Sequence, residues 1–273
     1  MINSDYFDVL NISDNQKSAD MIQAVMGKKC LGAFFLNGSA KLYFQSGLRE
    51  EVNIKLEEIH IDQMIEWNWE TQSKENWHLA WQDHFKPVVI ENKLAVIPYW
   101  ENDYPVENII KIKPGMAFGT GHHETTWLML RQMLKYLQPG ISVLDLGSGS
   151  GILSIAAKIM GARNVDAVEH DLDCKENFYE NLALNGISEG IQFHHGDVLH
   201  WNKLNYDLIL ANINFAVIEK LIPRLKDTQC EILLSGLLDT NYESFEQLSQ
   251  KYKLYVREKM IKGEWICILA EIQ

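Results

Sequence analysis

Apolar and polar positions follow two different patterns along the chain, and the more regular one fills its second half. From residue 141 onward, short apolar runs with strand-like composition alternate with stretches of helical periodicity. The runs predict strands at 143–146, 165–169, 191–195, 207–211 and 231–235, and the stretches between them predict helices at 152–160, 173–184, 215–221 and 242–252. This alternation is typical of a parallel sheet with helices on both faces.

The last two apolar runs, 254–260 and 265–271, are separated only by a short turn that contains Gly263. A parallel pair needs a crossover of about a dozen residues, so these runs predict an antiparallel hairpin. With the hairpin, the predicted sheet has seven strands. Gly161 and Gly186 follow the first two predicted helices, where glycine commonly ends a helix.

The first 72 residues show a different pattern, that of a small α+β unit. It predicts strands at 5–12 and 66–71, a helix at 18–26, and a hairpin with arms 33–36 and 41–45 around Asn37-Gly38. Residues 49–63 favour neither a helix nor a strand. We therefore expect one domain at 1–72 and a second at 73–273. The second opens with a helix at 76–85, whose Trp77 and Trp81 share a face that packs on a sheet or, alternatively, binds a partner.

Composition and charge limit what these domains can bind. A net charge of −12 disfavours nucleic acid and anionic membranes and favours basic partners. No apolar run reaches the roughly 20 residues that span a bilayer, and the first residues lack the features of a secretory signal. The four cysteines are scattered, which argues against a zinc site or a disulfide framework. We expect a cytoplasmic monomer with no direct nucleic-acid or membrane partner.

A glycine-rich loop, Gly147-Ser148-Gly149-Ser150-Gly151, follows the first strand of the predicted parallel sheet. Ligands bind open α/β sheets at the carboxyl ends of strands, where glycines let the backbone approach closely. A dinucleotide fingerprint would need glycine at Ile152, and neither a P-loop lysine nor a G-x-S-x-G elbow is present. The spacing suits a nucleoside with an amino-acid tail, although such turns also serve packing alone.

Two acidic residues at the next strand ends extend this interpretation. Glu169 stands 22 positions after Gly147, about where a carboxylate binds the two ribose hydroxyls. Asp197 follows the third strand, where an adenine amino group would lie. Each could instead be an ordinary solvated carboxylate. Together they indicate an adenosine site without a pyrophosphate site, and S-adenosyl-L-methionine is the ligand that fits.

Three segments resemble the ribosomal protein L11 methyltransferase family (PrmA). They are the run Lys113–Thr126 (KPGMAFGTGHHETT), the glycine loop within 143–153, and Ala211-Asn212-Ile213-Asn214, with weaker similarity at Gly263-Glu264-Trp265. The resemblance covers 73–273 well and 1–72 loosely. It implies a class I S-adenosylmethionine-dependent methyltransferase domain, with a Rossmann-like seven-stranded sheet and a C-terminal hairpin. A small ferredoxin-like α+β domain that captures the substrate protein would precede it.

The same resemblance implies, by position, that Thr126, Gly147, Glu169 and Asn212 bind the cofactor, although the family often has Asp at the position of Glu169. Phe118 would begin a loop over the methionine end of the cofactor. The expected cofactor-binding residues are thus Phe118, Thr126, Gly147, Ser148, Gly149, Gly151, Glu169, Asp197 and Asn212.

Asn212 is the candidate catalytic residue. Methyl transfer to an amine is an in-line displacement, for which the protein supplies orientation while the cofactor supplies the reactive group. The Asn212 side-chain oxygen could hold a neutral lysine amine in line, or the residue could simply cap the next helix. Thr125 and Thr126 are expected to cap a helix at 127–136. His122, His123 and Glu124 lack the second ligand pair of a metal site, so no metal is expected.

The sequence therefore predicts a protein N-methyltransferase that acts on amino groups of a basic ribosomal protein. Lysine side chains are the expected acceptors, with the N-terminal amine as a further candidate, and ribosomal protein L11 of the large subunit is the expected substrate. A methyltransferase for another protein lysine or a small amine is one alternative. A non-catalytic, cofactor-binding scaffold is the other, and it would not need a polar acceptor at Asn212.

Overall fold

The computed structural model describes residues 6–13, 22, 26, 29–36, 39–58, 66–73, 86–113, 123–226 and 228–272, and for 31–36 the backbone alone. The chain divides into two compact units, Met1–Phe85 and Lys86–Gln273. The expected domain boundary after residue 72 falls within the last strand of the first unit, and 74–85 lie outside the described residues, as do Trp77 and Trp81. That boundary therefore stays a prediction.

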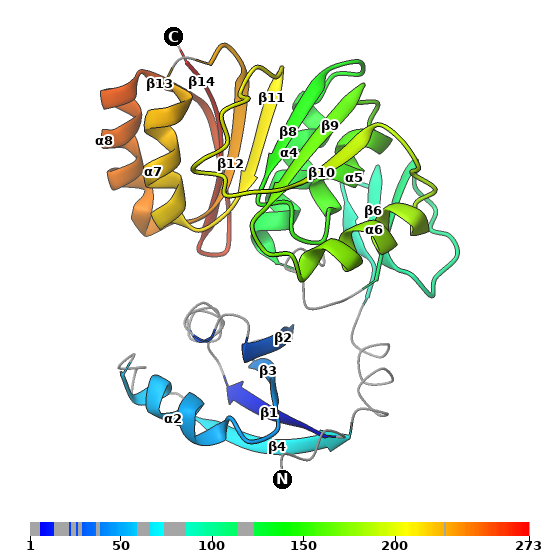
Figure 1. The fold of residues 1–273 in the computed structure, drawn as a ribbon, viewed down its shortest axis with the longest axis vertical. Helices are drawn as coiled ribbons and strands as arrows, with labels where there is room; N and C mark the ends of the chain where they lie inside the picture. Colours follow the sequence, from blue (N-terminus) through cyan, green and yellow to red (C-terminus); the bar gives the residue numbers. More distant parts are fainter. Residues whose placement is uncertain are drawn as a thin grey trace. The chain divides into compact units, whose positions relative to one another are not determined.

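The small unit is a four-stranded antiparallel sheet (Figure 1). Its elements are β1 (Tyr6–Ser13), β2 (Cys30–Leu36), β3 (Ser39–Gln45), α2 (Arg49–Glu58) and β4 (Trp67–Ser73). The strand order β2-β3-β1-β4 is that of the ferredoxin-like arrangement, so this part of the predicted fold is confirmed. The predicted hairpin is β2 paired with β3.

Residues 49–63, which favoured no element in the sequence, contain the helix α2. Val52 and Leu56 stand four positions apart on α2 and are buried against Leu42 and Phe44 of β3. Glu50 and Glu51 lie in the first turn, where acidic side chains complement the helix dipole. Packing of Val52 and Leu56 thus stabilises the helix. Two apolar positions are too few for periodicity to indicate a helix from the sequence.

The large unit contains the predicted seven-stranded sheet. Its strands are β8 (Ser142–Leu146), β9 (Asn164–Glu169), β10 (Ile191–His195), β11 (Leu208–Asn212), β12 (Glu231–Leu238), β13 (Leu254–Lys262) and β14 (Trp265–Ile272). The order is β10-β9-β8-β11-β12-β14-β13. The first five are parallel, and the last two form the antiparallel hairpin.

Helices cover both faces of this sheet, as predicted (Figure 1). On one face lie α4 (Glu124–Tyr136), α5 (Ile152–Ile159) and α6 (Cys174–Leu184); on the other lie α7 (Phe215–Leu225) and α8 (Tyr242–Tyr252). Gly161 and Gly186 have positive φ at the ends of α5 and α6, which confirms their predicted role. None of the helices in the described part of the chain is both long and apolar enough to cross a bilayer.

A second, three-stranded sheet in the large unit was missed by the sequence analysis. It consists of β5 (Val88–Ile90), β6 (Leu94–Pro98) and β7 (Asn108–Ile112), in the order β5-β6-β7. Ile90, Leu94 and Ile110 are fully buried in the core beneath α4 and α5. The sheet leads the chain into the segment that begins at Lys113 and resembles the PrmA motif.

Candidate active site

The polar residues singled out in the sequence lie at the carboxyl edge of the parallel sheet. Glu169 ends β9, Asn212 ends β11, and the glycine loop follows β8 between them. Leu146 at the end of β8 pairs with Val168 on one side and with Ala211 on the other. The chain runs from β8 outward to β9 and β10, and then returns to β11 on the other side of β8, so the strand order reverses here. A crevice is expected at such a point, which is where open α/β sheets bind ligands.

Positive φ angles shape the glycine loop. Gly147, Gly149 and Gly151 have φ of 79°, 50° and 83°. At Gly147 a Cβ would lie 2.5 Å from Ile213 Cγ2, and at Gly151 it would lie 2.8 Å from the Phe178 ring. Packing therefore requires glycine at 147 and 151, and the positive φ of all three is a conformation that favours glycine.

Glu169 clamps the glycine loop. Its Oε2 accepts the Gly149 N–H at 2.9 Å and its Oε1 accepts the Asp171 N–H at 2.8 Å. The Gly147 and Ser148 amides donate to the Val168 carbonyl at 2.8 and 3.1 Å. Since each carboxylate oxygen can accept a second hydrogen bond, Glu169 can both hold the loop and receive ribose hydroxyls.

Asp197 makes local contacts at the turn after β10. Its Oδ1 accepts the Leu199 N–H at 2.8 Å and its Oδ2 lies 2.9 Å from His200 Nδ1. The Leu199 amide, followed by the His200 contact, lowers the pKa of this carboxyl below its usual value. Asp197 is thus ionised and anchored next to the edge where Glu169 lies, and its role in binding adenine stays a prediction.

Asn212 and Thr126 approach each other from different elements. Asn212 Nδ2 lies 3.5 Å from Thr126 Oγ1 on α4, and Thr126 is fully buried. The helix after Asn212 is capped by Asn214, whose side chain accepts the Val217 N–H at 3.1 Å. The alternative interpretation of Asn212 as a helix cap is therefore wrong.

The predicted caps of α4 are also wrong. His123 occupies the N-cap position and its Nδ1 accepts the Thr125 N–H, whereas Thr125 and Thr126 are buried inside the first turn. The His123 ring packs edge-on against Trp265 of the C-terminal hairpin, with ring centroids 4.9 Å apart. His123, for which the sequence analysis expected no metal, thus starts the helix that carries Thr126.

The end of β11 is fitted to a bulge in β12. The register shifts between Ser235 and Leu237, and Gly236 takes a φ of 93°. A Cβ on Gly236 would lie 2.1 Å from the Ile213 carbonyl oxygen. The Ile213 N–H donates to the Ser235 carbonyl at 3.1 Å, which fixes the backbone directly after Asn212.

Asp145 is a buried acid beneath the glycine loop to which the sequence analysis gave no role. Its Oδ2 accepts the Ser154 hydroxyl at 2.6 Å. Burial, opposed by the Ser154 hydrogen bond and assisted by the charge of Glu169, raises the pKa of Asp145 to about 7. The signal in the sequence was an acid within an apolar strand, because burial raises the pKa of a carboxyl group.

Unpartnered acceptors test whether this edge fits a ligand. Asn212 Oδ1, Ser148 Oγ and Asp145 Oδ1 are buried and have no hydrogen-bond partner among the described residues. A buried polar atom without a partner costs about 1–3 kcal/mol, so a site with such atoms favours a ligand that donates to them. Ammonium and hydroxyl donors match these atoms, and S-adenosylmethionine carries both. Phe118, the remaining expected cofactor residue, lies outside the described residues.

Comparisons with known proteins agree with this geometry. The family model described as "Ribosomal protein L11 methyltransferase (PrmA)" matches residues 10–273. A ribosomal protein L11 methyltransferase from an Exiguobacterium species is 35% identical over 204 residues, which cover 72% of this chain and 65% of the relative. One from Prochlorococcus marinus is 32% identical over 233 residues, covering 81% and 77%. The chain thus spans 65% of the length of the first relative.

A solved structure is similar as well. The crystal structure of a ribosomal protein L11 methylase from Lactobacillus delbrueckii subsp. bulgaricus is 30% identical and superposes with a TM-score of 0.64. The match covers 68% of this chain and 98% of that chain. The predicted class I methyltransferase sheet is therefore confirmed by the observed topology and by this match.

Asp145 predicts an unusual pH dependence of stability. The folded protein holds a proton up to a pKa of about 7, against an ordinary value of 3.8, so this group stabilises the fold fully below about pH 4. Its contribution falls as the pH rises to about 7. Asp145→Asn keeps the neutral shape, so its melting temperature should fall less between pH 5 and pH 8 than that of the wild type, as measured by calorimetry.

Asp207→Asn provides the control. The Ser142 hydrogen bonds lower the pKa of Asp207, so this carboxyl is ionised in both the folded and the unfolded chain over that range. Its removal should leave the slope between pH 5 and pH 8 unchanged. Identical slopes for the wild type and Asp145→Asn would contradict the assignment.

Proposed function

The chain belongs to the ribosomal protein L11 methyltransferase (PrmA) family, and on that premise we propose that it is an S-adenosylmethionine-dependent enzyme that methylates amino groups of ribosomal protein L11. The observation that carries this proposal is Asn212 Oδ1, a buried acceptor without a partner among the described residues, located beside Thr126 at the end of β11. A scaffold that only binds the cofactor has no need of such an acceptor.

The carboxyl edge supplies binding and orientation. We propose that Glu169 receives the ribose hydroxyls while it holds Gly149, and that Asp197, anchored by the Leu199 amide, binds the adenine amino group. Ser148 Oγ, a buried atom without a partner among the described residues, and the glycine loop with its positive φ angles are proposed to contribute to the same site. When bound, S-adenosylmethionine supplies an electrophilic methyl group on a sulfonium.

Asn212 is proposed to hold the substrate amine. A lysine amine attacks only when neutral, and its ordinary pKa is near 10.4, so it must lose a proton to water on entry. Transfer from water into a buried site lowers the pKa of an amine. Asn212 Oδ1 can accept a hydrogen bond from the neutral amine and direct its lone pair, while Thr126 fixes the rotamer of the amide.

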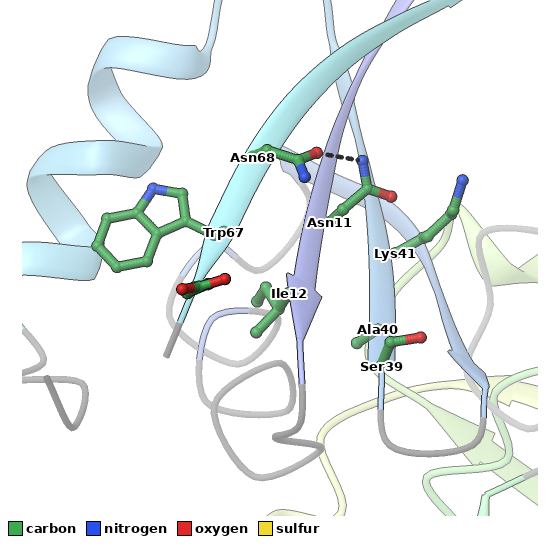
Figure 2. Close-up of a pocket in the computed structure, with 8 residues that line it drawn as sticks. Asn11, Ile12, Ser39, Ala40, Lys41, Trp67 and Asn68 are labelled. Atoms are coloured by element: carbon green, nitrogen blue, oxygen red, sulfur yellow. Dashed lines mark hydrogen bonds between the residues drawn. The ribbon is translucent and has the colours of Figure 1, made fainter. Parts of the chain in front are cut away.

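The small unit is proposed to dock the substrate protein. Figure 2 shows a hollow of mixed polar and apolar lining at one end of its sheet, where Asn11 Nδ2 donates to Asn68 Oδ1 at 2.9 Å. The hollow has a volume of about 640 Å³ and includes Trp67, which is 41% exposed. Lys41 of the same wall pairs with Glu70 at 2.8 Å. An exposed tryptophan among polar groups is typical of a protein-binding surface.

The net charge of −12 supports a basic partner, since opposite charge accelerates encounter. Ribosomal proteins that bind RNA are commonly basic, and for a substrate of this kind we propose that the enzyme acts in the cytoplasm. The same chemistry would methylate a lysine of another protein. The experiment below distinguishes L11 from such a substrate.

The direct test is methyl transfer to purified L11. Incubation of the protein with S-adenosylmethionine and L11 should increase the mass of L11 by one or more methyl groups in mass spectrometry. A lysate from cells that lack this protein, treated in parallel with labelled cofactor, identifies any other acceptor. No mass change in L11, with cofactor binding confirmed by calorimetry, would reject this substrate.

Asn212→Ala should separate chemistry from binding. Loss of the acceptor should lower kcat by about 100-fold, the usual effect of removing one polar group that acts in a transition state. The affinity for S-adenosylmethionine should change less. Asn214→Ala is the matched control, since it removes a helix cap two residues away and should lower the melting temperature rather than kcat. Equal kcat for Asn212→Ala and the wild type would contradict the catalytic role.

Trp67→Ala tests the docking surface. Truncation of a central interface aromatic commonly costs 2 kcal/mol or more, so kcat/KM for L11 should fall by about 30-fold. The KM for the cofactor should stay at its wild-type value. Tyr255→Ala, at a position 52% exposed on β13 of the large unit, is the control. Docking elsewhere would be indicated by an unchanged KM for L11 in Trp67→Ala.

A further inference from the structure

Two asparagines of α6 and a third at its C-cap, Asn185, form hydrogen bonds with the outer edge of β7 and with the residue that follows β7. Asn185 Oδ1 accepts the Lys111 N–H at 2.8 Å, and its Nδ2 donates to the Lys111 carbonyl at 2.7 Å. One turn earlier, Asn181 Oδ1 accepts the Lys113 N–H at 2.8 Å. A further turn back, Asn177 Nδ2 donates to the Lys113 carbonyl at 3.1 Å. The side chains of a helix thus take the place of a neighbouring strand.

Geometry explains why this ladder fits. Four residues of an α-helix rise about 6 Å and two residues of a strand rise about 6.6 Å, so Asn181 and Asn185 can meet the alternate residues Lys113 and Lys111. Asn177 adds a second contact to Lys113, at its carbonyl. Within the described residues, β7 is an edge strand of its sheet, and edge strands carry backbone groups that need partners. An asparagine amide offers both a donor and an acceptor at the required reach.

Asn181 differs from its two neighbours because it also reaches the glycine loop. Its Nδ2 donates to the Ser150 carbonyl at 2.9 Å, and its side chain is fully buried. Phe178 of the same helix fills the space where a Cβ on Gly151 would lie. The Asn181 amide therefore joins the glycine loop to Lys113. After Lys113 the chain continues into the segment that contains Phe118.

We propose that Asn181 is a positioning residue that sets the glycine loop against the chain at Lys113 and so determines the affinity for the cofactor. This inference rests on the proposed function, because the ligand of the loop is taken to be S-adenosylmethionine. Asn181 contributes no atom to the crevice edge itself. It acts through the Ser150 carbonyl, since loss of that hydrogen bond releases the loop while Glu169 still holds Gly149.

Asn181→Asp is the sharpest variant, because the carboxylate retains an acceptor for Lys113 but loses the donor to Ser150. We expect the Kd for S-adenosylmethionine, measured by calorimetry, to rise about 10-fold, as expected when a buried carbonyl loses its partner. At saturating cofactor, kcat should stay within about threefold of the wild type, so that the effect appears in the cofactor KM. Asn181→Ala removes both bonds without a buried charge and should give the same loss if the Asp variant fails to fold.

Asn185→Asp is the matched control. It makes the same chemical change at the end of the same helix and loosens Lys111, but the hydrogen bonds of Asn185 among the described residues go to Lys111, Asn181 and Leu182 rather than to the glycine loop. Its melting temperature should fall while the Kd for the cofactor stays within about twofold. Hydrogen exchange in the ligand-free protein should become faster at residues 147–151 in the Asn181 variants and remain unchanged there in Asn185→Asp.

The outcomes separate this inference from the proposed function. Folded Asn181 variants with wild-type Kd and wild-type exchange at 147–151 would overturn the positioning role. Equal losses of affinity in the Asn181 and Asn185 variants would overturn it too, since they would show a general effect of stability. If the wild type itself fails to bind S-adenosylmethionine, the proposed cofactor is wrong, and the exchange measurement alone decides the role of Asn181.

Discussion

The hydrogen bond from the Gly149 amide to the Glu169 carboxylate is the constraint on which the site depends. Together with the Gly147 and Ser148 bonds to the Val168 carbonyl, it joins the loop after β8 to the end of β9. The bond forms because parallel strands deliver their carboxyl ends to one edge, and because glycine permits the backbone to turn there. Asn212 then arrives on the other side of β8 by the same rule. The arrangement of the polar groups is therefore a property of the sheet topology, and each side chain only completes it.

Much of this arrangement could be predicted from the sequence because it rests on local periodicity. The five parallel strands and the final hairpin follow from apolar runs and turn residues, and the site residues follow from their positions at strand ends. The sheet β5-β6-β7 was missed because no helix stands between its short strands, so this part of the chain lacks the strand–helix alternation that indicated the large sheet. The caps of α4 were assigned to the threonines, since a histidine is a less common cap; burial of Thr125 and Thr126 in the first turn decided otherwise.

Contacts between residues far apart in the chain could not be predicted from a single sequence. The contacts of Asn181 with Lys113 and Ser150 join residues 68 and 31 positions apart. In the sequence, the three asparagines are simply polar residues on a helix of low amphipathicity. Asp145 was visible as an acid before the glycines, but its altered titration depends on burial, which comes from the packing of both helical layers.

The bulge at Gly236 limits which substitutions β12 can accept. Its Cα faces the Ile213 carbonyl so closely that no side chain can be accommodated there. Most buried positions of β12 are aliphatic and can exchange one such residue for another of similar volume with modest loss. Any other residue at position 236 would shift the backbone next to Asn212. Gly236 on β12 and Asn212 on β11 are therefore constrained together, because a side chain at 236 would displace the Ile213 backbone directly after Asn212.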